Sequence, residues 1–188
     1  MGRWEPDARG RLGRAAMELY RERGFDQTTV AEIAERAGLT KRTFFRHYAD
    51  KRDVLFAGTD LLREVVVRAI AEAPASLPPF AVVSLGLEAA AGMVQERPED
   101  VKLRQAVIDA HLELQERELV KLAAMAGDIA TALGERGLGL WPARLVAETG
   151  MAAFRVAFAR WIADSAEGPL TKVVRESMEE LTATATAG

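Results

Sequence analysis

Residues 28–51 read TTVAEIAERAGLTKRTFFRHYADK, which predicts two short helices joined by a glycine turn. Thr29 lies three residues before Glu32, so the threonine hydroxyl and the glutamate carboxylate can form a capping box at a helix start. Apolar residues then recur at the spacing of one helical face, at Val30, Ile33, Ala34 and Ala37. Gly38 follows where a left-handed residue ends a helix without steric cost. The first helix should therefore be about two turns long.

The second helix of this stretch should begin after Thr40, which is another good N-cap residue. Leu39 and Phe44 occupy the two positions of a hydrophobic staple, which fixes the angle at which the chain enters the helix. Phe44 and Tyr48 lie four residues apart and should face inward. The other positions are mostly basic or can donate hydrogen bonds: Lys41, Arg42, Thr43, Phe45, Arg46 and His47. A helix-turn-helix of this kind places its second helix in a groove of DNA.

The longer run from Ala15 to Phe56, AAMELYRERGFDQTTVAEIAERAGLTKRTFFRHYADKRDVLF, resembles the DNA-binding domain of the tetracycline-repressor (TetR) family of bacterial regulators. The order and spacing agree without a gap. The shared features are the RGF turn, the TTV cap, the AGLT turn, an aromatic pair in the recognition helix and a lysine that opens the next helix. A glycine turn alone would be a weak match, but the whole series is specific. From Thr59 onward only helix pattern and length guide the interpretation.

The composition is compatible with a DNA-binding protein of the cytoplasm. The 188 residues include no cysteine, which excludes a disulfide framework and a thiolate zinc site and suits a reducing compartment. No apolar run is long enough to span a bilayer, so no membrane association is expected. The net charge of −3 conceals an asymmetry, because residues 1–52 are net basic and the remainder is net acidic. A local basic patch matters more for DNA affinity than the overall charge.

The pattern along the chain predicts an all-α fold of about nine helices, with no convincing strand. A three-helix DNA-binding domain over 1–50 should precede a helical bundle for ligand binding and dimerisation over 51–188, which is also the architecture that the resemblance implies. Asp50 should cap one long helix that runs past Ile70 and links the two domains. The other helices are expected at 7–23, 79–96, 98–112, 142–165 and 169–181, and an amphipathic helix should continue from about residue 112 to residue 136.

The resemblance also implies roles for residues around the recognition helix. Thr40 and Lys51 would hold phosphates at helix N-termini, and Lys41, Arg42, Thr43 and Arg46 are candidates for reading base edges. Many members have a tyrosine at Phe45 that contacts the DNA backbone, so only an apolar or stacking contact carries over here. His47 either donates to a phosphate or is a partly exposed packing residue. Thr29, at the cap of the preceding helix, completes the predicted DNA-binding set.

The last two helices of the family form a four-helix dimer interface, and the resemblance therefore implies a homodimer with twofold symmetry. The helix over 142–165 is apolar on more than one face, which means that it is buried on more than one side. The predicted interface residues are Leu145, Thr149, Ala152, Val156, Leu170, Val173, Val174, Ser177, Met178 and Leu181. The alternative is an ordinary core helix of a monomer.

Family members commonly bind a small molecule in the C-terminal bundle. Candidate lining residues are apolar side chains and one histidine: Leu62, Val66, Met93, Val107, His111, Met125, Phe154, Phe158 and Trp161. Each is also compatible with ordinary core packing, and His111 with a hydrogen-bonded structural histidine. The scarcity of buried charge favours an apolar or amphipathic effector.

Enzymatic motifs are missing from the sequence. It has no phosphate-binding P-loop, no HExxH zinc helix and no GxSxG elbow. We therefore predict no catalytic residue, no metal and no cofactor. The predicted function is a TetR-type transcriptional repressor that a small effector releases from a pseudo-palindromic operator in double-stranded DNA. The alternatives are a regulator without a small-molecule effector and a helical protein-interaction module.

Overall fold

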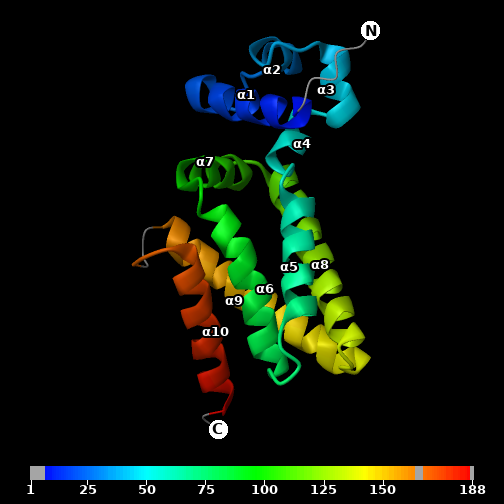
Figure 1. Ribbon diagram of the computed structural model, residues 1–188. Coiled ribbons are helices and arrows are strands. Elements are labelled where there is room, and N and C mark those ends of the chain that lie inside the picture. The colour runs from blue at the N-terminus through cyan, green and yellow to red at the C-terminus, as the bar shows by residue number, and fades with distance from the viewer. Residues whose placement is uncertain (1–6, 164–166, 187–188) are drawn as a thin grey trace. The chain divides into compact units, whose positions relative to one another are not determined.

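The computed structural model describes residues 7–163 and 167–186, and within these ranges it contains ten helices and no strand (Figure 1). The all-α prediction is confirmed. The helices are α1 (Ala8–Arg23), α2 (Val30–Arg36), α3 (Lys41–His47), α4 (Lys51–Leu55), α5 (Thr59–Glu72), α6 (Pro79–Val94), α7 (Pro98–Asp109), α8 (Leu112–Glu135), α9 (Leu140–Ile162) and α10 (Leu170–Thr186). The last helix continues past the expected end at Leu181. The expected end of the preceding helix at Ser165 lies outside the described residues.

The single linking helix expected after Asp50 is wrong, because the structure divides it into α4 and α5. Helix α4 ends at Leu55, and the amide of the following residue, Phe56, donates to the Asp53 carbonyl oxygen in a tighter i to i+3 turn. Gly58 follows, and glycine disfavours continuation of a helix. The side chain of Phe56 is buried in the N-terminal core. Burial of the Phe56 ring therefore stabilises a turn at a position where the sequence pattern predicted an uninterrupted helix.

The chain forms two compact units, and the first does not end at residue 50. It continues through Gly58 and also includes Lys102–Gln115, which contribute the end of α7 and the beginning of α8. The core of this unit joins apolar residues of α1 to α4 with three residues from the distant segment: Val107, Ile108 and Leu114. The hydrophobic pattern of α7 does not show which of the two cores its apolar residues enter. The prediction from sequence therefore assigned this segment to the C-terminal bundle.

The second unit comprises Thr59–Val101 and the chain from Glu116 onward. In this unit α6 packs against α5, α9 and α10. Two glycines allow close approach of the helices: a Cβ at Gly150 would lie 2.6 Å from Val83 Cγ1, and one at Gly86 would lie 3.0 Å from Ile70 Cγ1. The guanidinium group of Arg136 closes the end of α5 by donating to several carbonyl oxygens, among them that of Ala73 at 2.8 Å. The bundle is thus closely packed at its helix crossings.

Candidate nucleic-acid interface

The capping box at the start of α2 is confirmed. The Glu32 amide donates to Thr29 Oγ1 at 3.3 Å, and the Thr29 amide donates to Glu32 Oε2 at 2.8 Å. The backbone hydrogen bond from Thr29, followed by the bond from its hydroxyl, lowers the pKa of the Glu32 carboxyl. Helix α2 ends before Gly38, whose φ of 65° is the left-handed conformation expected from the sequence. These local interactions set where the turn before α3 begins.

Helix α3 begins at the predicted N-cap. The Thr43 amide donates to Thr40 Oγ1 at 3.1 Å, and the two threonine hydroxyls are hydrogen-bonded to each other. Phe44 and Tyr48 are buried in the N-terminal core, as their spacing predicted. The Tyr48 hydroxyl donates to the Arg9 carbonyl oxygen on α1 at 3.1 Å. Burial of Phe44 and Tyr48 fixes the inner face of α3. The residues on the opposite side of the helix must therefore face outward.

The outer face of α3 is cationic and exposed. Lys41, Arg42 and Arg46 are all exposed, and no ion pair neutralises them among residues 7–163 and 167–186. Phe45 is 58% exposed between these cations. Thr43 and His47 are half-buried. Free guanidinium and ammonium groups on one face of a short helix can neutralise phosphates or donate to base edges.

His47 is less accessible than its predicted role requires. Its Nε2 atom is buried and has no hydrogen-bond partner within the described part of the chain. A hydrogen bond from His47 to a phosphate could therefore come only from Nδ1. The packing interpretation of His47, which the sequence left open, agrees better with this burial.

Lys51, which the sequence predicts to hold a phosphate, has a structural role within the first unit. Its ammonium group donates to the carbonyl oxygens of Phe25 at 2.8 Å, Thr28 at 3.0 Å and Asp26 at 3.1 Å. An ammonium group has three protons, and these three bonds use all of them. The Lys51 carbonyl oxygen in turn accepts a hydrogen bond from the Tyr20 hydroxyl at 2.7 Å, and burial raises the pKa of that hydroxyl. Lys51 thus fastens the turn between α1 and α2 to the start of α4.

Of the predicted ligand-binding residues, His111 lies in the N-terminal unit together with Val107. Its Nδ1 donates to the Val107 carbonyl oxygen at 2.7 Å, and its Nε2 lies 3.2 Å from Asp26 Oδ1. The imidazole also packs edge-on against the Phe25 ring, with centroids 5.1 Å apart. The bond to the Val107 carbonyl, then that to Asp26, raises the pKa of His111. An imidazole that meets an oxygen acceptor at both nitrogens must be protonated to donate at both, so this arrangement favours imidazolium.

Two further polar contacts connect the segment 102–115 to α4. Arg104 Nε donates to the Leu55 carbonyl oxygen at 2.7 Å, and Arg52 Nε donates to Glu113 Oε1 at 2.7 Å. Sequence reasoning missed all of these contacts. The exposed charge pattern of α7 and α8 gives no signal that would have identified partners about 50 to 85 residues away.

The structure separates the predicted ligand-binding residues. Val107 and His111 belong to the first unit, whereas Val66, Met125 and Trp161 are buried in the core of the second. Leu62, Phe154 and Phe158 pack against that second core, and Met93 is half-buried. On α9 the rings of Phe154 and Phe158 stack with centroids 6.2 Å apart, and Trp161 follows at 6.3 Å from Phe158.

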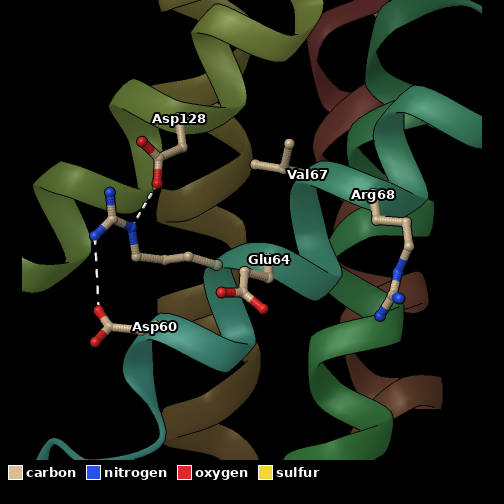
Figure 2. A pocket seen from close by; sticks show the side chains of 6 residues that line it. Asp60, Glu64, Val67, Arg68 and Asp128 are labelled. Atoms are coloured by element: carbon tan, nitrogen blue, oxygen red, sulfur yellow. Dashed lines mark hydrogen bonds and ion pairs between the residues drawn. The ribbon is translucent and has the colours of Figure 1, made fainter.

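A groove of about 500 Å³, lined mostly by charged residues, lies along α5 and α8 of the second unit (Figure 2). Its lining residues are Asp60, Arg63, Glu64, Val67, Arg68 and Asp128, and none of them was predicted to bind a ligand. Arg63 forms ion pairs with Asp128 and, at 3.8 Å, with Asp60. Figure 2 shows Arg68 extending away from Asp128. The ion pair between Arg63 and Asp128 joins α5 to α8 at this groove.

The predicted dimer residues fall into two groups. Leu145 and Val156 are 68% and 57% exposed, and Thr149 and Ala152 lie between them on the same stripe of α9. The residues of α10 are different, because all but Leu181 are buried in the chain's own core: Leu170, Val173, Val174, Ser177 and Met178. Their assignment to a subunit interface is corrected accordingly. A regular apolar stripe predicts burial, and here α6 and α9 supply it.

None of the described helices has the length and apolar character needed to cross a membrane.

Comparison with known proteins identifies the N-terminal region. Residues 13–57 match the family model of "Bacterial regulatory proteins, tetR family". The HTH-type transcriptional regulator TcmR of Streptomyces glaucescens is 35% identical over 88 residues, which are 47% of this chain and 39% of that protein. The uncharacterised HTH-type regulator Rv2250c of Mycobacterium tuberculosis is 39% identical over 64 residues, or 31% of this chain and 34% of that protein. The chain thus matches little more than a third of the length of these relatives.

Solved structures extend the similarity to nearly the whole chain. FadR of Thermus thermophilus, a TetR-family repressor solved with lauroyl-CoA, is 27% identical, with a TM-score of 0.56 and 93% of each chain covered. FadR of Bacillus halodurans, a fatty acid degradation regulator, has a TM-score of 0.69 at 17% identity, with 96% of each chain covered. The SmeT–triclosan complex has a TM-score of 0.67 at 15% identity, covering 94% of this chain and 90% of SmeT. The last two similarities concern the fold alone.

Proposed function

Because this chain belongs to the tetR family of bacterial regulatory proteins, we propose that it is a DNA-binding transcriptional repressor. The observation that carries the proposal is the outer face of α3, where Lys41, Arg42 and Arg46 are exposed and free of ion pairs within the described residues. The capped start of α3 and the buried side chain of Phe44 hold this face in one orientation. A rigid cationic helix of this size fits the major groove of B-form DNA.

On DNA, the cations of α3 divide between two tasks. Those that neutralise phosphates hold the domain on any sequence, while an arginine that meets guanine O6 and N7 selects a base. Thr40 and Thr43 add hydroxyl and methyl groups at the start of the same helix. Lys51 stabilises the domain from within and is not one of the phosphate contacts that we propose.

The repressor acts as a homodimer in this proposal. The exposed stripe of α9, from Leu145 to Val156, is the surface that a second copy would cover. Twofold symmetry would place two recognition helices in successive major grooves, about 34 to 36 Å apart, on a pseudo-palindromic operator. Covering this stripe also removes exposed apolar area from water, which favours association.

A small apolar or amphipathic effector in the second unit would release the repressor. The partly buried rings of Phe154 and Phe158 supply apolar surface next to the core of that unit. Support comes from the solved relatives, among which FadR of Thermus thermophilus was solved with lauroyl-CoA and SmeT with triclosan. An effector shifts the equilibrium only as far as its affinities for the two states differ. A regulator that acts on bacterial chromosomal DNA works in the cytoplasm.

The test is DNA binding by the purified chain. Fluorescence anisotropy would compare the DNA flanking the chain's own gene with shuffled DNA of the same length and composition, at several salt concentrations. We expect tighter binding to the flanking DNA, and a linear fall of log affinity with log salt concentration for both DNAs. The triple variant Lys41→Ala, Arg42→Ala, Arg46→Ala should lose binding to both, whereas Glu116→Ala, on the exposed side of α8, should not. Absence of binding to any DNA at low salt would refute the proposal.

A further inference from the structure

Phe45 is a large apolar side chain on the outer face of the recognition helix. It is 58% exposed. Lys41 and Arg42, one helical turn before it, lie on the same side of α3, and Arg46 is next to it in sequence. A phenyl ring among free cations contributes nothing to solubility, and its burial in the chain's own core is ruled out by this exposure. A bound partner that covers this ring would remove its apolar surface from water.

The ring of Phe45 is held in place by aromatic neighbours. It meets the ring of Phe44 edge to face, with centroids 5.5 Å apart and planes at 83°. Phe44 is fully buried and packs against Tyr48, also at 5.5 Å, and the Tyr48 hydroxyl is tied to α1 through the Arg9 carbonyl oxygen. Edge-to-face pairs of this kind favour a defined geometry. The ring is therefore oriented before it meets a partner, which lowers the entropy lost on binding.

The chemistry of the side chain restricts what it can recognise. Phenylalanine has no hydroxyl, so Phe45 cannot hydrogen-bond to a phosphate oxygen or to a polar base edge. In the major groove the base pairs present donors, acceptors and one apolar group, the C5-methyl of thymine. We propose that Phe45 reads the C5-methyl group of a thymine, and so selects a T·A pair in each half-site. This inference rests on the proposed function, because it requires α3 to lie in the major groove.

The test replaces single thymines by uracil, which removes the methyl group and leaves every hydrogen-bonding atom of the base unchanged. A duplex would first be enriched from a random-sequence library with the purified full-length chain. Deoxyuridine would then replace each thymine of the half-site in turn, with the symmetric position changed together. At one position we expect the affinity of the unmodified chain to fall about 4-fold for each half-site. This is the effect of losing the burial of one methyl group, about 0.8 kcal/mol.

A double-mutant cycle assigns this effect to Phe45. Phe45→Ala should bind the thymine and uracil duplexes equally well at that position, while Phe45→Tyr, which keeps the ring, should still prefer thymine. Thr43→Ser removes another methyl group from α3 and serves as the matched control, because it should leave the loss at the Phe45 position intact. If Phe45→Ala shows the same thymine preference as the unmodified chain, or if uracil is neutral at every position, the inference is wrong.

The outcomes separate this inference from the proposed function. Failure to enrich or bind any duplex would refute DNA binding itself. Tight binding to an enriched duplex without a Phe45-dependent methyl effect would refute only the reading of thymine. Because Phe45 is mostly exposed and loses only its edge contact with Phe44, Phe45→Ala should stay folded and unfold within a few degrees of the unmodified chain. Thermal unfolding by circular dichroism verifies that a loss of affinity reflects the interface.

Discussion

The ammonium group of Lys51 lies over the ring of Phe25, 4.5 Å from its centroid, and donates a hydrogen bond to the Phe25 carbonyl oxygen at 2.8 Å. Two more carbonyl oxygens of the same turn accept its other protons. The lysine that opens α4 therefore organises the turn between α1 and α2. The same turn contacts His111 through Phe25 and Asp26, so that three separate parts of the first unit meet there.

We predict that Lys51→Ala destabilises the first unit by about 2 kcal/mol, because hydrogen bonds to a charged group are lost and partly buried carbonyl oxygens are left unpaired. Hydrogen exchange measured by mass spectrometry should show faster exchange in peptides from α1 and α2. Lys41→Ala, which removes an exposed lysine of α3, is the matched control and should leave exchange unchanged. Unchanged exchange in Lys51→Ala together with weaker DNA binding would instead restore the phosphate role inferred from the family resemblance.

A second prediction concerns specificity on α3. Arg46 is exposed and, within the described residues, unpaired, and it stands one turn beyond Arg42. If Arg46 binds a guanine, Arg46→Ala should weaken binding to the enriched duplex by about 1–3 kcal/mol and leave binding to random DNA nearly unchanged. A residue that contacts only phosphate behaves differently. Its loss weakens binding to both DNAs and lowers the slope of log affinity against log salt concentration by about 0.9 for each phosphate contact. Titrations of both DNAs at four salt concentrations distinguish the two, and an equal loss on both would rule out base reading by Arg46.

The features predicted correctly from the sequence are those that a few neighbouring residues determine. The capping box of Thr29 and Glu32 and the inward direction of Phe44 and Tyr48 depend on residues three and four apart. The roles of Lys51 and His111 depend on carbonyl oxygens and a carboxylate that the fold brings from elsewhere, including Asp26, 85 positions before His111. Sequence spacing contains no information about such partners.

The burial of α10 illustrates a second limit. Its stripe at Val173, Val174 and Ser177 has the period of one helical face, and that face is buried as expected. Periodicity indicates that a face is covered but not which surface covers it. Here it is the chain's own bundle, and the surface left open is on α9. The break between α4 and α5 has a similar origin, because it depends on where Phe56 packs.

A third prediction concerns pH and His111. The pKa of His111 is raised above its ordinary value of 6.5 by its hydrogen bond to the Val107 carbonyl and its contact with Asp26. Asp26 and Glu113 are the acidic groups that act on the imidazole. Because the folded pKa is the higher one, the stabilisation is fully present below about pH 6.5 and is lost as the pH rises through the folded pKa. Urea denaturation between pH 5.5 and 8.5 should show this loss.

Substitution of either partner should flatten that profile. His111→Gln keeps a donor for the Val107 carbonyl but does not titrate, and Asp26→Asn keeps the size of the side chain and removes its charge. The first should abolish the His111 contribution to the pH dependence and the second should reduce it. A profile that is as steep in His111→Gln as in the unmodified chain would show that another group is responsible.

A fourth prediction tests the close packing of the bundle. A methyl group at Gly150 would lie 2.6 Å from Val83 Cγ1, so Gly150→Ala should destabilise the protein by about 1–3 kcal/mol through overpacking. Val83→Ala in the same chain makes room and should recover part of the loss. Gly127→Ala is the matched control, because nothing lies within 4 Å of its Cβ position and the change should stabilise α8 by about 0.5–1 kcal/mol. Denaturant unfolding measures all four chains, and equal stability of Gly150→Ala and the unmodified chain would contradict this packing.

The final prediction concerns the exposed stripe of α9. If a second copy covers Leu145 and Val156, a charge at Leu145 must be buried or the dimer must dissociate. In Leu145→Arg, each of the two symmetric subunits loses the burial of one leucine side chain, which contributes about 1.5 kcal/mol or more to association. This loss alone, before any cost of burying a charge, weakens the dimer at least about 100-fold. Sedimentation velocity at micromolar concentration should then show a monomer. Leu61→Arg introduces the same change at another exposed leucine, on α5, and should leave the dimer intact. A monomeric unmodified chain, or a Leu145→Arg chain that is as dimeric as Leu61→Arg, would exclude this stripe as the interface.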